Sequence, residues 1–368
     1  MRKLLVFHQS IAPYRIDFFN AIYKKYQCSI CVFKRGLNGQ TLDNTKLEER
    51  HLFKVEYYAE RNKILRFLPK GIWSKLKKER PDVILVNECG PVSILAIIYK
   101  MTQRLFGRKI KVISMIDDSY DMTINKEKQF TYRHTIAKKI LIPLFDNIIC
   151  VDQDVASYYQ KKHNIGTYMP IVSEDDISRE RYKNVISISN RYVEKYNLSN
   201  KRVLVFVGRL VKLKNLQFVI PEILKSKHQD IRLIIVGSGD YEIELKKIAN
   251  DANRIIFVGQ QEGDNLFAFY NVGQIFILPS YQEAFGAVTN EALLAGCYSL
   301  ISNRAGSRCL IQEGVNGEVF DPYDSALFSN ILDSVLDKIQ PIELPLKLKP
   351  NLMPKTFEEY FKNVEKII

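Results

Sequence analysis

Three apolar runs in the second half of the chain each end at a glycine, and this pattern constrains the fold more than any other feature. The runs cover residues 201–209, 231–236 and 254–258, and their terminal glycines are Gly208, Gly237 and Gly259. Continuous apolar runs of this length are typical of parallel strands that are buried on both faces. Because helical stretches separate the runs throughout the 368 residues, we expect parallel, doubly wound sheets that bind ligands at the carboxyl ends of their strands.

Two cations stand where the first of these runs turns into a helix. Arg209 follows the strand directly, and Lys214 precedes an amphipathic run at residues 216–224. Arginine makes bidentate contacts to phosphate and lysine acts as a point charge, so this turn suits a diphosphate. A glycine after a strand also occurs at ordinary tight turns, so no single motif is decisive. The interpretation depends on the order in which these motifs follow one another along the chain.

Two carboxylates, Glu283 and Glu291, flank a loop further along the chain. The residues before the loop predict a strand, and residues 287–295 predict a helix. The backbone N–H groups near Phe285 and Gly286 then lie at the start of that helix, where anions bind. In the alternative, Glu283 caps the helix and Glu291 is a solvated helix residue.

In this order, the motifs resemble the donor half of retaining family 4 glycosyltransferases of the GT-B fold, glycosyl transferases group 1. The resemblance covers residues 200–322 and rests on Val207-Gly208-Arg209-Leu210 with Lys214, Val236-Gly237-Ser238-Gly239, Phe257-Val258-Gly259, Glu283 to Glu291, and Gly314-Val315-Asn316-Gly317. It implies two Rossmann-like, doubly wound parallel-sheet domains that face a central cleft. It also implies a role in surface-polysaccharide or lipopolysaccharide biosynthesis.

The resemblance assigns a set of residues to the donor. They are Gly208, Arg209, Lys214, Gly237, Val258, Gly259, Phe285, Gly286 and Glu291. Arg209 and Lys214 would stabilise the departing diphosphate. Glu291 would bind the ribose hydroxyls, and Glu283 would contact the sugar and favour its cationic ring. Neither an enzymic nucleophile nor a metal or other cofactor is implied, since the leaving phosphate itself takes the proton of an acceptor that attacks the same face.

The amino-terminal half matches the family less closely. Residues 11–20 resemble the loop and first helix of members that build surface polysaccharides, without the paired glycines that many members carry there. Arg15 replaces them as a donor contact in one interpretation and pairs with Asp17 or another surface acid in the other. Asp117 and Asp118 follow a predicted strand, and by resemblance either is a candidate for orienting the acceptor near the reacting sugar.

The chain is long enough for two domains that each bury a core. We expect residues 1–170 to form the acceptor-side domain, with a helix at residues 356–368 packing back on it. Residues 199–350 would form the domain that binds the nucleotide-sugar, and residues 171–198 would form an irregular, charged linker with one short helical piece. Since no apolar stretch spans a bilayer and the amino terminus leads directly into a strand, we expect a cytoplasmic protein.

The net charge of +13 is concentrated in the first half of the chain. Residues 1–200 carry 35 Lys and Arg against 21 Asp and Glu, whereas the rest carries 19 against 20. The densest part, residues 61–80, is amphipathic and contains Trp73, which fits a peripheral contact with an anionic membrane surface. In the alternative, this part is a solvated helix with its apolar face in the core. Nucleic-acid binding is disfavoured, since the chain has no aromatic stacking platform and no zinc-finger spacing.

Two further patterns favour structural roles over metal binding. Cys28 and Cys31 have the spacing of a metal or redox pair, but in a strand they point to opposite faces, and no second pair completes a zinc site. Asp152 and Asp154 have the spacing of a metal-binding motif, but they open a helix, which favours capping. We therefore expect no metal site.

Together these features predict a hexosyl- or N-acetylhexosaminyl-type transferase. It would move a sugar from a UDP-sugar, in preference to a GDP-sugar, to a lipid-linked or polysaccharide acceptor at the inner face of the cytoplasmic membrane. The alternative is a catalytically inactive GT-B relative that binds the nucleotide-sugar without transferring it. The presence of both Glu283 and Glu291 beside Arg209 and Lys214 argues against that alternative.

Overall fold

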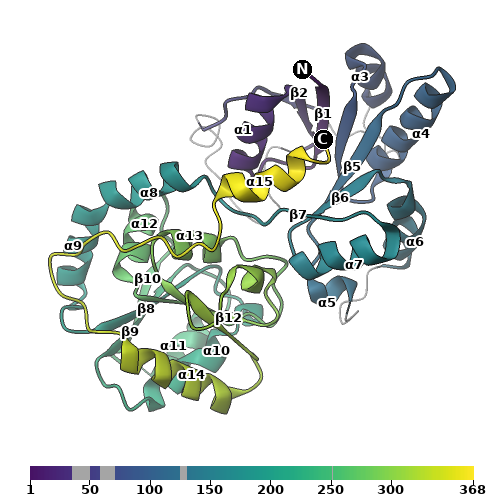
Figure 1. The fold of residues 1–368 in the computed structure, drawn as a ribbon. Coiled ribbons are helices and arrows are strands. Elements are labelled where there is room, and N and C mark those ends of the chain that lie inside the picture. Colours follow the sequence, from purple (N-terminus) through teal and green to yellow (C-terminus); the bar gives the residue numbers. More distant parts are fainter. Residues whose placement is uncertain (35–49, 59–70, 125–130, 251) are drawn as a thin grey trace. The chain divides into compact units, whose positions relative to one another are not determined.

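The protein consists of two compact units, shown in Figure 1. Unit 1 comprises Met1–Ile171 and Glu358–Ile368, and unit 2 comprises Val172–Phe357. The computed structural model describes residues 1–34, 50–58, 71–124, 131–250 and 252–368. Each unit is built on its own sheet.

Unit 1 contains a parallel sheet with the strand order β3-β2-β1-β4-β5-β6-β7 among its described residues. The strands are β1 (Lys3–His8), β2 (Gln27–Val32), β3 (Val55–Tyr57), β4 (Val83–Asn87), β5 (Lys111–Ile116), β6 (Asn147–Cys150) and β7 (Thr167–Tyr168). The helices are η1 (Pro13–Arg15), α1 (Ile16–Lys25), α3 (Ile72–Glu79), α4 (Pro91–Leu105), α5 (Tyr120–Thr123), α6 (Tyr132–Leu141), η2 (Ile142–Leu144), α7 (Gln153–His163) and α15 (Phe357–Glu365).

Helices cover both faces of this sheet, which explains its apolar strands. On one face Leu76 of α3, Ala96 of α4, Leu141 of α6 and Val155 of α7 share a core cluster with the strands. Such two-sided burial is what continuous apolar runs predict for parallel strands. The four helices α3, α4, α6 and α7 therefore lie on the same side of the sheet.

Helix α15, at the carboxyl end of the chain, packs beside α1 (Figure 1). The rings of Phe18 and Phe361 meet edge to face with centroids 5.9 Å apart. Lys25 Nζ lies 2.7 Å from a carboxylate oxygen of Glu358 and 2.8 Å from one of Glu365. A segment more than 300 residues from α1 in the sequence thus completes the core of unit 1.

Unit 2 contains a second parallel sheet, with the strand order β10-β9-β8-β11-β12-β13. The strands are β8 (Arg202–Val207), β9 (Ile231–Val236), β10 (Ile255–Gly259), β11 (Ile275–Leu278), β12 (Tyr298–Ser302) and β13 (Gly317–Phe320). The helices are α8 (Asp175–Asn184), α9 (Ile186–Lys195), η3 (Lys212–Lys214), α10 (Leu216–Lys225), α11 (Glu242–Ala249), α12 (Gly263–Val272), α13 (Val288–Leu294), η4 (Gly306–Leu310) and α14 (Ser325–Lys338).

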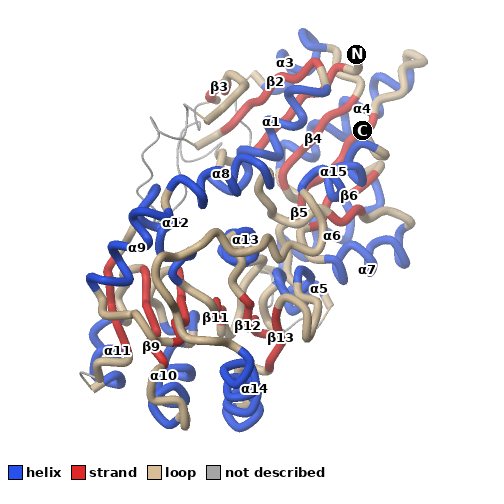
Figure 2. Tube along the Cα trace, turned by 60° about the vertical axis from the view of Figure 1, so that its left-hand side comes forward, coloured by secondary structure: helices blue, strands red, loops and turns tan. Residues whose placement is uncertain are grey.

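The second sheet is also enclosed on both faces. Leu216 of α10 and Phe328 of α14 belong to the core cluster on one face. Val193 of α9, Phe269 of α12 and Ala292 of α13 belong to the cluster on the other. Figure 2 shows α10 and α14 on one side of these strands and α9, α12 and α13 on the other. The strand β8 lies between β9 and β11, so its carboxyl end is in the interior of the edge where sheets of this kind generally bind ligands.

The segment 171–198 is not irregular as expected, because helices α8 and α9 occupy most of it. The one short helical piece expected there lies within α9, whereas α8 was not expected. Tyr182 of α8 is fully buried, and its hydroxyl donates a 2.7 Å hydrogen bond to the main-chain oxygen of Glu291. Arg179 donates bonds of 2.7 Å to the carbonyl oxygens of Leu294 and Lys349. Because α8 is mostly polar, its sequence does not indicate that Tyr182 and Arg179 contact the rest of unit 2.

Candidate functional site

The strands β8, β9 and β10 end in glycines whose backbones touch. The N–H of Gly208 donates to the Val236 oxygen at 3.0 Å, and the N–H of Gly237 donates to the Gly259 oxygen at 2.9 Å. Gly237 has φ +144°, and a methyl group on its Cα would overlap the carbonyl oxygen of Gly208. Only glycine fits at position 237, so the backbone itself is accessible where these three strands end.

Lys214 reaches this edge from the short helix η3. Asn215, which follows it, is fully buried in a left-handed conformation at φ +59° and donates a 3.2 Å bond to the Pro322 oxygen. This conformation, which asparagine tolerates well, ends η3 and lets α10 begin. A methyl group at Gly208 would lie 3.9 Å from Lys214 Cε. The lysine stem therefore lies against the first glycine of the edge.

The ammonium group of Lys214 forms an ion pair with the carboxylate of Glu283. The two side chains are 16% and 20% exposed. The N–H of Glu283 donates to the Arg304 oxygen at 3.2 Å, and its own oxygen accepts from Gly306 at 3.2 Å, which fixes the loop. The structure thus brings together two residues that the sequence placed in separate motifs.

The loop after Glu283 turns sharply at Gly286. Its φ is +93°, and a methyl group there would lie 2.7 Å from Leu278 Cδ2 and 3.2 Å from Glu283 Cγ. Phe285 is buried, and its carbonyl oxygen accepts a 2.7 Å bond from the N–H of Ser307. Among the described residues no side chain caps the start of α13, so the capping alternative for Glu283 is wrong.

Glu291 lies on α13 beside two buried tyrosines. Tyr270 donates a 2.8 Å hydrogen bond from its hydroxyl to Glu291 Oε2, and Tyr182 donates to the Glu291 main-chain oxygen. Burial raises the pKa of Tyr270 well above its ordinary value, and the Glu291 carboxylate raises it further. Tyr270 therefore remains a hydrogen-bond donor and fixes the orientation of the Glu291 carboxylate. This contact distinguishes Glu291 from an ordinary solvated helix residue. No pattern in the sequence singles out Tyr270, which lies in the apolar helix α12.

The other residues predicted for the donor lie at the same edge of the sheet. Arg209 is exposed at the end of β8. The Val258 oxygen accepts a 2.8 Å bond from Gln261 Nε2, and Gly259 has φ +72°. Contacts connect Gly208, Lys214, Glu283 and Gly286, whereas Asp117 belongs to unit 1.

In unit 1, Asp117 forms an ion pair with Arg15, whose side chain is 3% exposed. Of the two interpretations of Arg15, the structure shows pairing with an acid, which is Asp117 and not Asp17. Asp118 forms a second buried ion pair with Lys138 of α6. Burial lowers the pKa of Lys138.

Glu88, which the sequence analysis did not single out, completes this polar cluster at the carboxyl end of β4. Its backbone is left-handed at φ +60°, and its Oε1 accepts a 3.1 Å bond from the N–H of Asp117. Burial, followed by the Asp117 charge, raises the pKa of Glu88 to about 7. His8, at the end of β1, is buried too, and burial followed by the Arg15 charge lowers its pKa to about 4. An acid directly after an apolar strand was the available signal for Glu88.

The two patterns assigned to structural roles lie at the start of α7 and within β2. Asp152 caps α7, accepting bonds from the N–H groups of Asp154 at 2.8 Å and Val155 at 3.3 Å, which confirms the capping prediction. Burial raises the pKa of both Cys28 and Cys31 to about 12, so they are protonated thiols at neutral pH.

Comparison with protein families identifies unit 2. The model of the family "Glycosyl transferases group 1" matches residues 189–351. Most of unit 2 therefore matches the group 1 glycosyltransferase family. An uncharacterised glycosyltransferase of Methanocaldococcus jannaschii is 32% identical to this protein over 124 residues. That match covers 32% of this chain and 31% of the relative, so the chain spans less than a third of its curated relative.

Unit 1 and unit 2 together resemble solved structures over nearly the whole chain. Anabaena HepE, crystallised with UDP, has a TM-score of 0.71 at 18% identity, over 92% of this chain and 90% of that one. The lipopolysaccharide outer core galactosyltransferase WaaB has a TM-score of 0.66 at 17% identity, over 99% and 98%. The protein has the GT-B fold, which confirms the fold class drawn from the sequence. The family match at residues 189–351 confirms the resemblance of the second half to glycosyl transferases group 1.

Proposed function

We propose that the protein is a retaining glycosyltransferase that moves a sugar from a nucleoside diphosphate donor to a lipid-linked or polysaccharide acceptor in cell-surface glycan biosynthesis. The observation that supports this most is the Lys214–Glu283 pair, which lies against Gly208 in a group 1 domain. At the carboxyl edge of a parallel sheet, a cation can stabilise the negative charge of a departing diphosphate and a carboxylate can stabilise the positive charge of the sugar ring.

Departure of the diphosphate leaves negative charge on its phosphate and positive charge on the sugar ring. Lys214 would transfer its contact from Glu283 to the diphosphate, and the exposed Arg209 would reach the same phosphates from the end of β8. Glu283 would then contact the sugar hydroxyls and favour the cationic ring. The N–H groups of Phe285 and Gly286 would add donors to the diphosphate.

The nucleoside would bind further along the same edge. Glu291, oriented by Tyr270, would accept hydrogen bonds from the ribose hydroxyls. Backbone atoms at Val258 and Gly259 would contact the base, and Gly237 would allow the diphosphate to approach the main chain. HepE has been crystallised with UDP and with UDP-glucose, which supports a UDP-sugar over a GDP-sugar.

Transfer would proceed on one face of the sugar. The bond from the anomeric carbon to the diphosphate oxygen breaks, the acceptor oxygen attacks from the same side, and the leaving phosphate takes the acceptor proton. No protein nucleophile takes part. Unit 1 would supply the acceptor side, with Asp117 orienting the acceptor hydroxyl.

We also propose that the protein acts at the inner face of the cytoplasmic membrane. Of the basic stretch at residues 61–80, the part before residue 71 lies outside the described residues. In the described part, Trp73 packs edge to face on Tyr99, with centroids 5.6 Å apart, and Lys75 forms ion pairs with Glu56 and Glu79. This part of the stretch therefore contributes to the core, and Lys77 and Lys78 remain exposed.

The test is release of nucleoside diphosphate from a panel of UDP- and GDP-sugars. Lys214→Ala should lower turnover by roughly a hundredfold, as loss of one transition-state donor does. Lys212→Ala is the matched control, because Lys212 is an exposed lysine of the same short helix and should leave turnover unchanged. Protection against thermal unfolding by UDP without turnover would favour the inactive relative. Absence of both protection and turnover would contradict donor binding altogether.

A further inference from the structure

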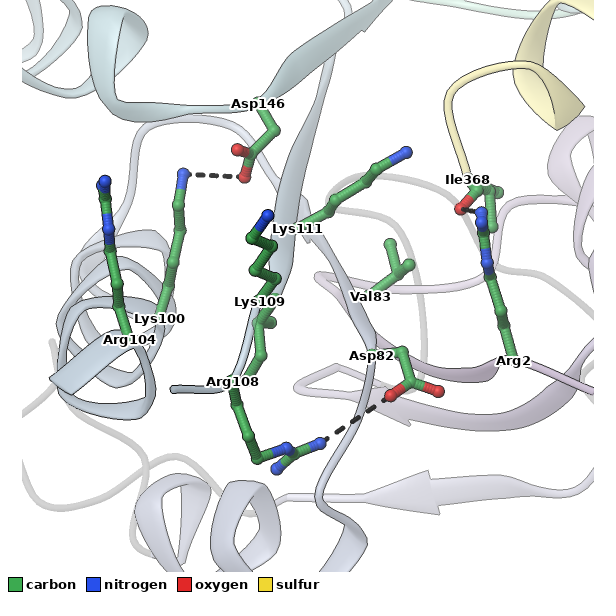
Figure 3. A pocket seen from close by; sticks show the side chains of 11 residues that line it. Arg2, Asp82, Val83, Lys100, Arg104, Arg108, Lys109, Lys111, Asp146 and Ile368 are labelled. Atoms are coloured by element: carbon green, nitrogen blue, oxygen red, sulfur yellow. Dashed lines mark hydrogen bonds and ion pairs between the residues drawn. The ribbon is translucent and has the colours of Figure 1, made fainter. Parts of the chain in front are cut away.

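A pocket of about 450 Å³ lies at the amino edge of the unit 1 sheet. Its lining is strongly basic, as Figure 3 shows. The charged residues that line it are Arg2, Lys100, Arg104, Arg108, Lys109, Lys111, Asp82 and Asp146. Six cations therefore face two acids.

The two acids are already engaged. Asp146 lies 2.7 Å from Lys100 Nζ, and Asp82 lies 3.7 Å from an Arg108 nitrogen. Across the described part of the chain, neither Arg104 nor Lys109 has an ion-pair partner, and both are exposed. Arg2 and Lys111 donate to the main-chain oxygens of Ile368 and Ile367 at the same pocket. The side chains that line the pocket thus leave an excess of positive charge at Arg104 and Lys109.

The pocket is separate from the polar cluster of the same unit. Its residues Asp82, Lys109 and Asp146 precede strands β4, β5 and β6, whereas Glu88 and Asp117 follow β4 and β5. The two groups therefore lie at opposite edges of one parallel sheet. Because α/β sheets bind substrates at the carboxyl edge, the basic pocket is not part of the transfer site.

Helix α4 carries an exposed apolar stripe that leads to this pocket. Ile94, Ile98, Met101 and Leu105 are spaced by four, three and four residues, which places them on one face of the helix. All four are exposed, Leu105 at 84%, and Phe106 directly after the helix is 80% exposed. Arg104 lies next to the most exposed end of this stripe.

Helix α6 continues the apolar surface on the same side of the sheet. Tyr132, Ile136 and Ile140, spaced by four residues, are all exposed. Helices α4 and α6 contribute to the same core cluster, and Lys100 of α4 donates a 3.2 Å bond to the Leu144 oxygen of the adjoining η2. The two stripes thus belong to neighbouring helices of one face.

We propose that the α4–α6 face, defined by these two stripes and the basic pocket, binds the surface of an anionic phospholipid bilayer. The apolar side chains enter the interface, and the cations of the pocket bind phosphate headgroups. Charge complementarity selects this occupant, because aliphatic and aromatic residues bordered by unpaired Lys and Arg are the composition of interfacial membrane-binding helices. The inference rests on the proposed function only for the place of action, the inner face of the cytoplasmic membrane. The vesicle-binding experiment does not require that the protein transfer a sugar. No helix in the described part of the chain has the length and apolarity to traverse a bilayer.

The experiment measures co-sedimentation of the full chain with phosphatidylcholine vesicles and with mixed phosphatidylcholine and phosphatidylglycerol vesicles. The wild-type chain should bind the mixed vesicles preferentially. Arg104→Gln with Lys109→Gln should lower the partition coefficient at least about tenfold, since each cation near an anionic surface contributes. Leu105→Ser with Phe106→Ser should reduce binding to both vesicle types.

A matched control changes an exposed apolar residue and an exposed cation of unit 2. Ile243→Ser with Lys338→Gln, at positions of similar exposure, should bind as the wild type does. UDP protection against thermal unfolding should be equal in all variants, so that failure of donor binding is distinguished from failure of membrane binding. Equal binding of all variants, or no preference for anionic vesicles, would overturn the proposal. Sedimentation without vesicles gives a further outcome. If the wild type sedimented as a dimer and the apolar variant as a monomer, a second copy of the chain would cover the face, and the proposal would be overturned.

Discussion

Lys214 and Glu283 are 69 residues apart in the chain, yet their side chains form an ion pair beside Gly208 at the carboxyl edge of the second sheet. Each partner compensates the charge of the other. On the proposed function, a bound donor would offer both of them new partners, a diphosphate for the lysine and a sugar for the carboxylate. The pair would then couple donor binding to catalysis.

Glu283→Gln should separate these two effects. The variant leaves Lys214 without its carboxylate, so UDP should bind as tightly as in the wild type or more tightly. Turnover should fall by roughly a hundredfold, because the sugar loses a charge that favours its cationic transition state. Calorimetric UDP titration and assays of UDP release measure the two quantities. A parallel loss of UDP affinity and turnover would show that Glu283 acts on the diphosphate side instead.

Tyr270→Phe should loosen the orientation of Glu291. A hydrogen bond to a charged group contributes about 2 kcal/mol, so the free energy of unfolding of unit 2 should fall by about that amount. The donor KM should rise several-fold while kcat changes little, since ribose contacts act in the ground state and the transition state alike. The control is Tyr192→Phe, whose hydroxyl donates a 3.0 Å bond to Asn265 at the surface. If both variants behave alike, Tyr270 has no specific role at the site.

Gly237→Ala tests the close approach of two strand ends. The added methyl group would meet the Gly208 carbonyl, and we expect a loss of stability above about 3 kcal/mol together with loss of UDP binding. Gly314→Ala separates this clash from backbone strain, because Gly314 has φ +74° but open space around it. That control should cost only about 1 kcal/mol. Similar urea unfolding curves for the two variants would exclude the steric account.

The stability of unit 1 should depend on pH through Glu88. Its pKa rises from an ordinary value of 4.5 to about 7 in the folded state, so the folded protein holds this proton more tightly. The stabilisation is full below the ordinary pKa and is lost as pH rises through 7, by about 1 to 3 kcal/mol. The charge of Asp117 also raises the pKa of Glu88, whereas the hydrogen bond from the Asp117 N–H and the charges of Lys138 and Arg15 lower it.

The measurement is urea unfolding of the wild type and Glu88→Gln between pH 5 and pH 8. His8 contributes in the opposite direction below its ordinary pKa of 6.5, because its folded pKa is about 4, but it is present in both proteins. The stability difference between wild type and variant should therefore decline as pH rises. A difference that stays constant over this interval would contradict the account.

The sequence predicted the strands and their glycines well because buried parallel strands have few alternatives. The interval 231–236 matches β9, and the interval 201–209 contains β8. The polar helix α8 escaped detection because its one fully buried contact residue, Tyr182, gives no periodic signal. A periodic hydrophobic pattern predicts a helix that packs on a sheet. It does not predict a polar helix that is held by a single buried tyrosine.

Side-chain pairings within the site could not be predicted from order along the chain. Lys214 was assigned to phosphate and Glu283 to sugar, but their mutual ion pair depends on the loop that Gly286 turns. Glu88 and His8 were missed for a related reason, since their shifted pKa values arise from burial among neighbours brought in by different strands. The sequence predicts which side chains lie at the carboxyl edge of a sheet. The packing of the folded chain determines which of these side chains contact one another.

The most direct test of donor binding is a crystal structure of the protein with a non-hydrolysable UDP-glucose analogue. We predict that the diphosphate lies within hydrogen-bond distance of Lys214 Nζ at the carboxyl edge of the second sheet, with Glu291 bound to the ribose. An analogue bound elsewhere, with Lys214 still paired to Glu283 and Arg209 directed into solvent, would contradict the account.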